Sequence, residues 1–336
     1  MNSEQMMFLL QEAGYEITGQ TDGVDAVVIN TCGFIESAQQ EAVDVILEMA
    51  ELKAQGRIGK IIVAGCLAQR FGTQVADELP EIDALVGVGS FQDVVSAVRG
   101  AFQNDRPVLF GDIDAPDTES GRVFTTSGIW EYIKIAEGCD NRCAYCTIPD
   151  IRGRFRSRPV ENIVSEARKF AERGVRELIV VAQDITRYGI DLYGKRSLSR
   201  LLRELAAIDG IDWIRLHYLY PDEIDDELID LIANNDKILK YLDIPIQHIN
   251  DSILKSMCRR GTGQEIRELF RKLRDRIDGV VIRTSIITGL PGEGETEFEE
   301  LCEFLREAKL ERAGVFPFSP EEGTRAAAME HPDADT

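Results

Sequence analysis

Three cysteines near the middle of the chain have a spacing that suits metal chemistry. Cys139, Cys143 and Cys146 follow the pattern C-x3-C-x2-C. Alternating apolar residues over 132–137 predict a strand that ends at Gly138, so the cysteines follow a strand end. A compact loop there directs three thiolates to one point. Three thiolates on a four-iron cluster leave the fourth iron without a protein ligand, and a small molecule can bind at that iron.

Two other uses of clustered cysteines suit the pattern less well. Structural zinc takes four Cys or His ligands, most often in C-x2-C pairs, and no matching second pair follows within twenty residues. A disulfide framework needs an oxidising compartment and usually a small chain. Three free core thiols are not expected at a strand end beside Asp140, Asn141 and Arg142. The spacing therefore favours an iron–sulfur cluster.

The composition is ordinary, with 336 residues of which 44% are hydrophobic and 29% charged. This length predicts two domains, each able to bury a sizeable core. No apolar run approaches the length of a membrane span, and residues 1–10 carry an acid, Glu4, where a signal peptide has basic residues. Seven cysteines without a secretory signal predict a cytoplasmic location, where thiols serve metals or chemistry.

The net charge of −21 bears on the partner. An acidic chain gains nothing from the phosphate attraction that drives general nucleic-acid binding, and it repels nucleic acid at long range. A basic protein would be attracted instead. Solubility alone explains the charge equally well, so the charge only disfavours free RNA as a substrate.

The first hundred residues alternate strands with helices. Strands are predicted at 25–31, 60–64 and 84–88, and helices at 35–49, 68–78 and 91–98. This βαβ order predicts a flavodoxin-like domain with a parallel sheet. Cys32 and Cys66 each follow a strand, at the edge where open α/β sheets place their ligands. A lone cysteine is usually a buried structural residue, but this shared position beside the downstream motif favours a second cluster.

Six further strand–helix units follow from residue 131 onward. Strands are predicted near 132–137, 177–183, 213–219, 241–246, 280–288 and 312–318, and helices near 159–173, 198–208, 223–235, 264–276 and 295–308. Six parallel units predict an incomplete, TIM-like (β/α)6 barrel with its working residues at the carboxyl ends of the strands. The predicted domains are 1–102 and 131–322, with a linker at 103–130 and a tail at 323–336. Polar residues follow the strands at Gln183, Asp184, His217, Tyr218, Gln247, His248, Ser285, Thr288 and Gly289.

The segment 138–159, GCDNRCAYCTIPDIRGRFRSRP, resembles the radical S-adenosylmethionine (SAM) methylthiotransferases. It is most similar to those members that modify an aspartate of the twelfth small-subunit ribosomal protein. The resemblance implies a [4Fe-4S] cluster on Cys139, Cys143 and Cys146 that binds and cleaves SAM. It also implies an auxiliary [4Fe-4S] cluster on Cys32, Cys66 and a third, N-terminal cysteine. The radical generated from SAM would take hydrogen from the aspartate β-carbon, which then receives a methylated sulfur.

The resemblance also assigns roles around SAM. Tyr145 would back the adenine, and Gln183 with Asp184 would meet the amino-acid end. The strand that carries Ser285 and ends at Gly289 would lie against SAM. The roles of His217 and His248 stay open, because a structural histidine fits the sequence as well as a catalytic one.

Both ends of the family pattern are expected to be missing from this chain. The stretch Asn2-Ser3-Glu4 resembles the residues just after the first auxiliary cysteine, and the family continues beyond Thr336 into a small β-barrel, the TRAM domain. An external electron donor, a sulfur donor and a monomeric state are expected. Two other functions remain open: methylthiolation of tRNA adenosine (of the i6A or t6A type), and a non-catalytic iron–sulfur carrier or scaffold.

Two smaller groups of residues have a structural interpretation. Arg152, Arg154, Arg156 and Arg158 form a basic run that is more typical of a solvated or internally paired face than of a substrate contact. Cys258 and Cys302 fall in or beside helical stretches away from strand ends, and we interpret them as structural.

Overall fold

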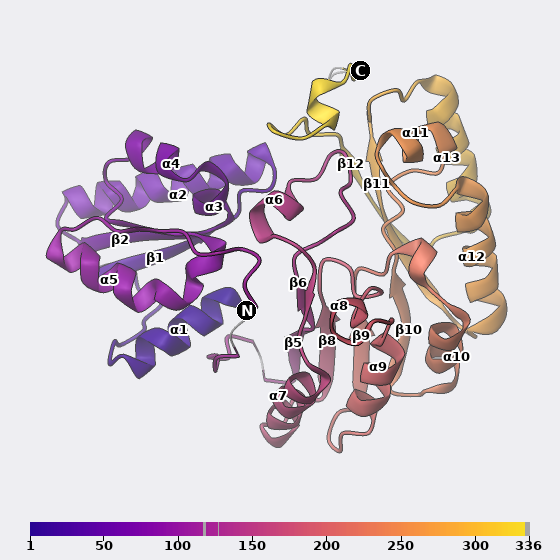
Figure 1. The fold of residues 1–336 in the computed structure, drawn as a ribbon, viewed down its shortest axis with the longest axis horizontal. Coiled ribbons are helices and arrows are strands. Elements are labelled where there is room, and N and C mark those ends of the chain that lie inside the picture. Colours follow the sequence, from indigo (N-terminus) through magenta and orange to yellow (C-terminus); the bar gives the residue numbers. More distant parts are fainter. Residues whose placement is uncertain (117–118, 127, 333–336) are drawn as a thin grey trace. The chain divides into compact units, whose positions relative to one another are not determined.

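The computed structural model describes residues 1–116, 119–126 and 128–332, and its chain forms two compact units (Figure 1). The first unit comprises Met1–Thr125 and Thr147–Arg154, and the second comprises Thr126–Cys146 and Phe155–Thr336. Parts of the predicted linker (117–118 and 127) and of the predicted tail (333–336) lie outside the described residues. The domain boundaries expected from the sequence stay a prediction.

The first unit is built on a parallel sheet with the strand order β1-β2-β3-β4. Its strands are β1 (Val24–Thr31), β2 (Ile58–Gly65), β3 (Ala84–Val86) and β4 (Val108–Leu109). Thr31 pairs with Gly65 in the register of β1 and β2. The two cysteines that follow these strands therefore start from neighbouring positions at one sheet edge.

Both faces of this sheet are covered by helices, because β2 is apolar on both sides. Ile61 and Val63 pack in one core cluster with α2 (Glu36–Ala54), α3 (Cys66–Phe71) and α4 (Thr73–Glu78). Ile62 and Ala64 pack in another with α1 (Asn2–Glu12) and α5 (Val94–Gln103). This arrangement, a parallel sheet with helices on both faces, is the α/β architecture expected from the βαβ order.

Two helices of this unit differ from the sequence-based prediction. The helix predicted at 68–78 is two helices, α3 and α4, because Gly72 has a φ of +53° between them. The helix predicted at 91–98 begins later, at Val94, after the 3-10 helix η1 (Val88–Asp93). Apolar periodicity continues across both breaks, so the pattern alone does not locate them.

The second unit contains a six-stranded parallel sheet in the order β12-β11-β10-β9-β8-β5. Its strands are β5 (Trp130–Lys134), β8 (Glu177–Val181), β9 (Trp213–Leu216), β10 (Ile238–Asp243), β11 (Val281–Thr288) and β12 (Arg312–Pro317). Strands adjacent in sequence are adjacent in space, and β5 and β12 are the two edges. The predicted incomplete (β/α)6 barrel and the α/β fold class are therefore confirmed.

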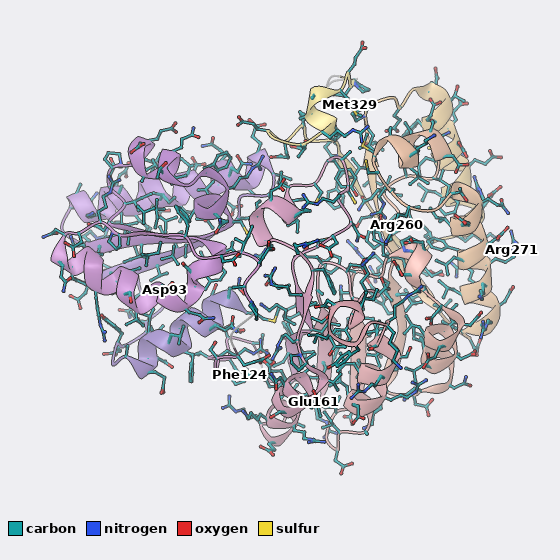
Figure 2. All side chains as sticks on the ribbon, in the orientation of Figure 1. Asp93, Phe124, Glu161, Arg260, Arg271 and Met329 are labelled. Atoms are coloured by element: carbon teal, nitrogen blue, oxygen red, sulfur yellow. The ribbon has the colours of Figure 1, made fainter. Side chains whose placement is uncertain are left out.

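Amphipathic helices connect these strands. They are α7 (Val160–Glu172), α9 (Leu198–Ala206), α10 (Asp226–Asn234), α12 (Gly263–Arg276) and α13 (Glu295–Ala308). Figure 2 shows the described side chains, with the exposed Arg271 on the outer side of α12. The helix predicted at 223–235 begins at Asp226, because Asp225 caps it by accepting a hydrogen bond from the Leu228 amide at 2.9 Å.

The structure also has several short elements. They are α6 (Ile148–Arg152), α8 (Ile190–Tyr193), α11 (Asp251–Ser256), η2 (Pro221–Glu223), η3 (Ala326–Ala328), β6 (Ala136–Glu137) and β7 (Arg156–Ser157). The strand predicted at 132–137 is divided, because β6 leaves the main sheet and pairs antiparallel with β7. None of the described helices is long and apolar enough to cross a membrane.

Candidate metal centre

The three central cysteines lie on one loop of the second unit, directly after β6. Gly138 turns the chain out of β6 with a φ of +74°, and Arg142 has a φ of +50°, which is unusual for a residue with a side chain. The Cys146 amide donates to the Cys143 carbonyl at 3.0 Å and closes the turn between them. None of the three cysteines forms a disulfide, and all three are partly exposed. The predicted cysteine loop therefore has the tight bends that three converging thiolates require.

Backbone bonds hold the middle of the loop on two sides. The Ala144 amide donates to the Met257 carbonyl at 2.9 Å, and the Ala144 carbonyl accepts from the Ala326 amide at 2.8 Å. Ala144 is buried in an apolar cluster with Ile253, Met257, Leu290 and Ala326. Tyr145 packs against the same cluster. The loop is thus anchored by α11 and by the segment around η3, which are both remote in sequence.

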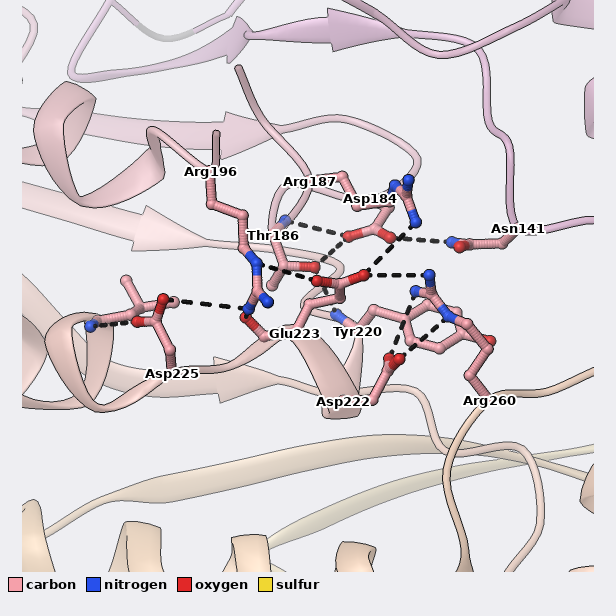
Figure 3. A network of polar contacts seen from close by, with 11 residues as sticks. Asn141, Asp184, Thr186, Arg187, Arg196, Tyr220, Asp222, Glu223, Asp225 and Arg260 are labelled. Atoms are coloured by element: carbon pink, nitrogen blue, oxygen red, sulfur yellow. Dashed lines mark hydrogen bonds and ion pairs between the residues drawn. The ribbon is translucent and has the colours of Figure 1, made fainter. Parts of the chain in front are cut away.

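A third anchor joins the cysteine loop to the end of β8 (Figure 3). Asn141 Nδ2 donates to Asp184 Oδ2 at 2.9 Å, and the Thr186 amide donates to Asp184 Oδ1 at 3.0 Å. The Thr186 hydroxyl also donates to Asp184 Oδ1. Asp184 is 1% exposed, and this burial raises the pKa of its carboxyl against the lowering effect of these hydrogen bonds. The structure places Asp184 as a support of the loop.

The network of Figure 3 extends from Asp184 into the loop after β9. Glu223 lies within ion-pair distance of Arg187 (3.4 Å), Arg196 (3.1 Å) and Arg260 (3.0 Å). Asp222 is 3.0 Å from Arg260 Nε. These charges fix the loops after β8 and β9 relative to each other.

The cysteine loop suits a multi-iron cluster better than a single metal ion. Within the described residues, no group of three or more His, Cys, Asp or Glu side chains converges as the ligands of one ion. In a cubane cluster each thiolate binds a different iron, so the thiolates need only surround the group. Three cysteine side chains on one bent loop, none of them in a disulfide, are a donor set whose chemistry fits a [4Fe-4S] cluster.

Burial controls protonation at this loop. It raises the pKa of the Cys139 thiol to about 11, and the nearby Asp184 and Cys143 add to this increase. Burial also raises the pKa of the Tyr145 hydroxyl well above its ordinary value, and the neighbouring Cys143 and Cys146 add to this increase against the lowering effect of the Arg259 charge. The Tyr145 phenol therefore stays protonated.

A layer of polar side chains lines the strands beyond the loop. Asp243, on β10, is 2.5 Å from Arg283 Nη1 on the neighbouring β11, and 3.3 Å from His217 Nδ1. Arg283 Nη1 also donates to Ser285 Oγ at 3.3 Å. On the first strand, Lys134 pairs with Glu137 at 2.9 Å. Asp243 and Arg283 were not among the predicted site residues, although both alternate with the buried apolar residues of their strands.

The other predicted cofactor residues differ in their surroundings. Gln183 is exposed after β8. Gly289, after β11, has a φ of +77°, and a Cβ built on it would meet no atom within 4 Å. This open space suits close approach of a ligand to the backbone. Two further residues have a positive φ: Tyr218, just after β9, at +65°, and Gln247, before α11, at +70°. Residues strained in this way concentrate at functional sites.

His248 has a buried acidic neighbour. It is 1% exposed, and its Nε2 lies 3.6 Å from Glu293 Oε1. Its Nδ1 accepts a hydrogen bond from the Asn250 amide at 3.0 Å. The side chain therefore holds the turn that leads into α11.

The two N-terminal cysteines lie at one edge of the first unit. Cys32 is exposed and Cys66 is buried. Arg152 Nη2, on α6, donates to Cys66 Sγ at 3.4 Å. The Asn30 side chain donates to Ser3 Oγ at 2.7 Å, so the start of α1 reaches the same edge. Cys66 thus has a cationic side chain within hydrogen-bond distance of its sulfur.

The basic run and the two remaining cysteines also have defined positions. Arg158 pairs with Glu166 at 2.8 Å and donates to the Lys134 carbonyl at 2.6 Å, in agreement with internal pairing. Cys302 is on α13. Cys258 packs against the apolar cluster beneath the cysteine loop and accepts from Arg325 Nη1 at 3.4 Å. Sequence spacing gave no sign that Cys258 lies so close to that loop.

Comparisons with known proteins agree with this architecture. Residues 133–305 match the Radical SAM superfamily, and residues 1–87 match the uncharacterized protein family UPF0004. The solved structure of the radical S-adenosylmethionine methyltransferase TsrM from Kitasatospora setae is similar, with a TM-score of 0.70. It is 14% identical and covers 97% of this chain and 70% of its own, so it shows the fold alone. Fold and cysteine loop together define a radical SAM protein.

Curated relatives show to which family within the radical SAM superfamily the chain belongs. A protein from Desulforamulus reducens named ribosomal protein uS12 methylthiotransferase RimO is 49% identical over 98% of this chain and 74% of its own length. The protein of that name from Pelotomaculum thermopropionicum is 50% identical over 98% of this chain and 74% of its own length. The chain belongs to the RimO family of radical SAM methylthiotransferases.

Proposed function

We propose that this chain is a methylthiotransferase for ribosomal protein uS12, with the β-carbon of an aspartate as its target. The observation that carries this proposal is the cysteine loop, which hydrogen bonds hold on three sides at the carboxyl edge of the barrel sheet. The chain is also 49% identical to the Desulforamulus reducens protein named ribosomal protein uS12 methylthiotransferase RimO. The net charge of −21 supports a basic protein partner.

The residues divide the work between the two units. Cys139, Cys143 and Cys146 would hold the cluster that binds SAM, and Cys32 and Cys66 would contribute to an auxiliary [4Fe-4S] cluster. When bound and reduced by one electron, SAM supplies the radical that takes hydrogen from an unactivated C–H bond. Tyr145 and the backbone at Gly289 would position SAM, with Gln183 and Ser285 as further contacts.

The polar side chains on the strands would bind the polar groups of SAM and of the substrate. Arg283 and His217 both face the Asp243 carboxylate, so their orientation is set before a ligand enters. Asp184 would act on SAM indirectly, because its oxygens already accept hydrogen bonds from Asn141 and Thr186. A preorganised polar layer costs little reorganisation when a substrate arrives.

The proposal extends to partners and location. We propose a cytoplasmic monomer that receives single electrons from an external donor and sulfur from a separate donor. None of the seven cysteines forms a disulfide in the structure, which supports a reducing compartment.

Mass spectrometry of a supplied substrate tests the function. The anaerobically reconstituted chain should, with SAM, sulfide and a reductant, add the mass of a methylthio group to uS12 at an aspartate. The matched control is the Cys143→Ala variant, which should leave uS12 unmodified. Modification of a tRNA transcript with none of uS12 would replace this proposal with the tRNA alternative. Modification of neither, by a chain with intact clusters, would favour the non-catalytic carrier.

A further inference from the structure

Arg259 is a buried arginine held rigidly beside the cysteine loop of the second unit. It lies between α11 and α12 and is 9% exposed. Its Nη2 donates to the Pro245 carbonyl at 2.5 Å, and its guanidinium stacks over the Tyr220 ring at 4.2 Å from the ring centroid. The Arg259 amide donates to the Leu254 carbonyl at 2.8 Å. These contacts fix the direction of the guanidinium.

The remaining side of this guanidinium faces a cysteine sulfur. Arg259 Nη1 lies 3.8 Å from Cys143 Sγ, within hydrogen-bond range for sulfur. The thiolates that Cys143 and its two companions would present to iron are the negative charges nearest to this contact. The arginine therefore points its charge at the place where a cluster would sit.

Arg259 differs from Arg158 and Arg122, two other arginines whose side chains are little exposed, in lacking a carboxylate partner. Arg158 is equally buried and pairs with Glu166, and Arg122 pairs with Glu4 at 3.0 Å. The ion pairs within 4.0 Å among the described residues include none between Arg259 and an Asp or Glu, and the nearby acids Asp222 and Glu223 pair with Arg260 instead. A buried charge without an ionic partner is costly, so a missing anion is implied at this position.

We propose that Arg259 is a positioning residue that orients the Cys143 thiolate and raises the reduction potential of the cluster bound there. This inference rests on the proposed function only in requiring a cluster on Cys139, Cys143 and Cys146. Reduction adds one negative charge to the cluster, and a fixed positive charge in a poorly solvated site stabilises the reduced form. Arg259 thereby makes the electron transfer that precedes SAM cleavage easier.

A redox titration followed by the electron paramagnetic resonance of the reduced cluster tests this proposal. The full chain carrying Cys32→Ala and Cys66→Ala is used, so that the signal belongs to one cluster. Arg259→Gln should lower the potential enough to decrease the reduced-to-oxidised ratio at least about tenfold, which is about 59 mV for one electron. Arg259→Lys keeps the charge and should shift the potential less.

Arg260→Gln is the matched control. This substitution removes the same formal charge one residue away. The Arg260 guanidinium also lies over the Tyr220 ring, 4.8 Å from the ring centroid. Its guanidinium is already compensated by Asp222 and Glu223, so this variant should shift the potential less than Arg259→Gln. A potential for Arg259→Gln equal to that of the parent, or a shift no larger than that of Arg260→Gln, overturns the proposal.

The remaining outcomes are also decisive. Arg259→Gln could fold but lose iron while Arg259→Lys keeps its iron and a near-parental reduction potential. That result would support the proposed role of the positive charge beside Cys143. If both variants lose iron equally, Arg259 serves packing and the proposal fails. A loaded chain that fails to modify uS12 leaves this result standing, whereas a parent without iron overturns the cluster assignment and the role of Arg259 together.

Discussion

Single side chains around the cysteine loop act mainly by fixing its conformation through hydrogen bonds. Asn141 is the clearest case, because its amide connects the loop to the buried Asp184 carboxylate on the neighbouring strand end. A buried acceptor that loses its donor pays the full desolvation cost of that group. The loop's geometry thus depends on residues that would not themselves bind iron.

Replacement of Asn141 by alanine tests this dependence. Asn141→Ala should lower the free energy of unfolding by about 1–3 kcal/mol, since Asp184 Oδ2 loses its donor, and should reduce the iron retained by the second unit. The measurements are denaturant unfolding and iron content. Gln183→Ala, at an exposed neighbour, is the control and should change stability by no more than about 0.5 kcal/mol. Equal unfolding midpoints for the two variants would rule out the anchoring role.

At the scale of elements, sheet edges bring the cysteines of the first unit together. The turn from β2 into α3 passes through Gly65, which has a φ of +107°. A Cβ at this position would lie 2.5 Å from the Thr31 carbonyl oxygen and 2.6 Å from Asn30 Oδ1. Only glycine lets β1 and β2 approach so closely just before Cys32 and Cys66.

Gly65→Ala should therefore disturb the edge that carries these cysteines. We expect a loss of unfolding free energy of about 1–3 kcal/mol or more from backbone strain and the clash with Thr31, together with loss of iron from the first unit. Gly56→Ala is the matched control, because Gly56 has a φ of +72° but open space around the added Cβ. Both glycine variants would also carry Cys139→Ala, so that the iron content measures the first unit alone. Equal iron in the two glycine variants would contradict this account.

The opposite edge of the same sheet depends on an acid. Burial by itself would raise the pKa of Asp83, but hydrogen bonds from Lys53, from the Ile61 amide and from Lys60 hold it below its usual value. A lowered folded-state pKa gives stability that is present above the unfolded value of about 3.9 and is lost as the pH falls through the folded value.

Asp83→Asn should reveal this pH dependence. The variant should be less stable than the parent at neutral pH and down to about pH 4, and the difference should shrink as the pH falls further. Urea unfolding at several pH values measures the difference. A gap that stays constant into the acid range would show that the Asp83 charge contributes nothing.

At the scale of the whole molecule, local patterns predicted the fold well and long-range contacts poorly. The alternation of strands with helices, and hence the two parallel sheets, follows from periodicity that is encoded within short segments. The order of the strands in the first sheet was not predicted. The sequence did not reveal that Arg259 meets Cys143, because 116 positions separate them. Nor did it reveal that Thr147–Arg154, directly after the cysteine loop, groups with the first unit, where Arg152 meets Cys66. Such pairings depend on tertiary packing and have no local signature.

The measurement that tests the central claim most directly is release of 5′-deoxyadenosine from SAM by the anaerobically reconstituted, reduced chain. It would be made for the parent and for a variant with Cys139, Cys143 and Cys146 all changed to alanine. The account predicts release by the parent and none by the variant, even when the variant keeps about four irons through the first unit. Release by the variant, or none by a fully loaded parent, would contradict it.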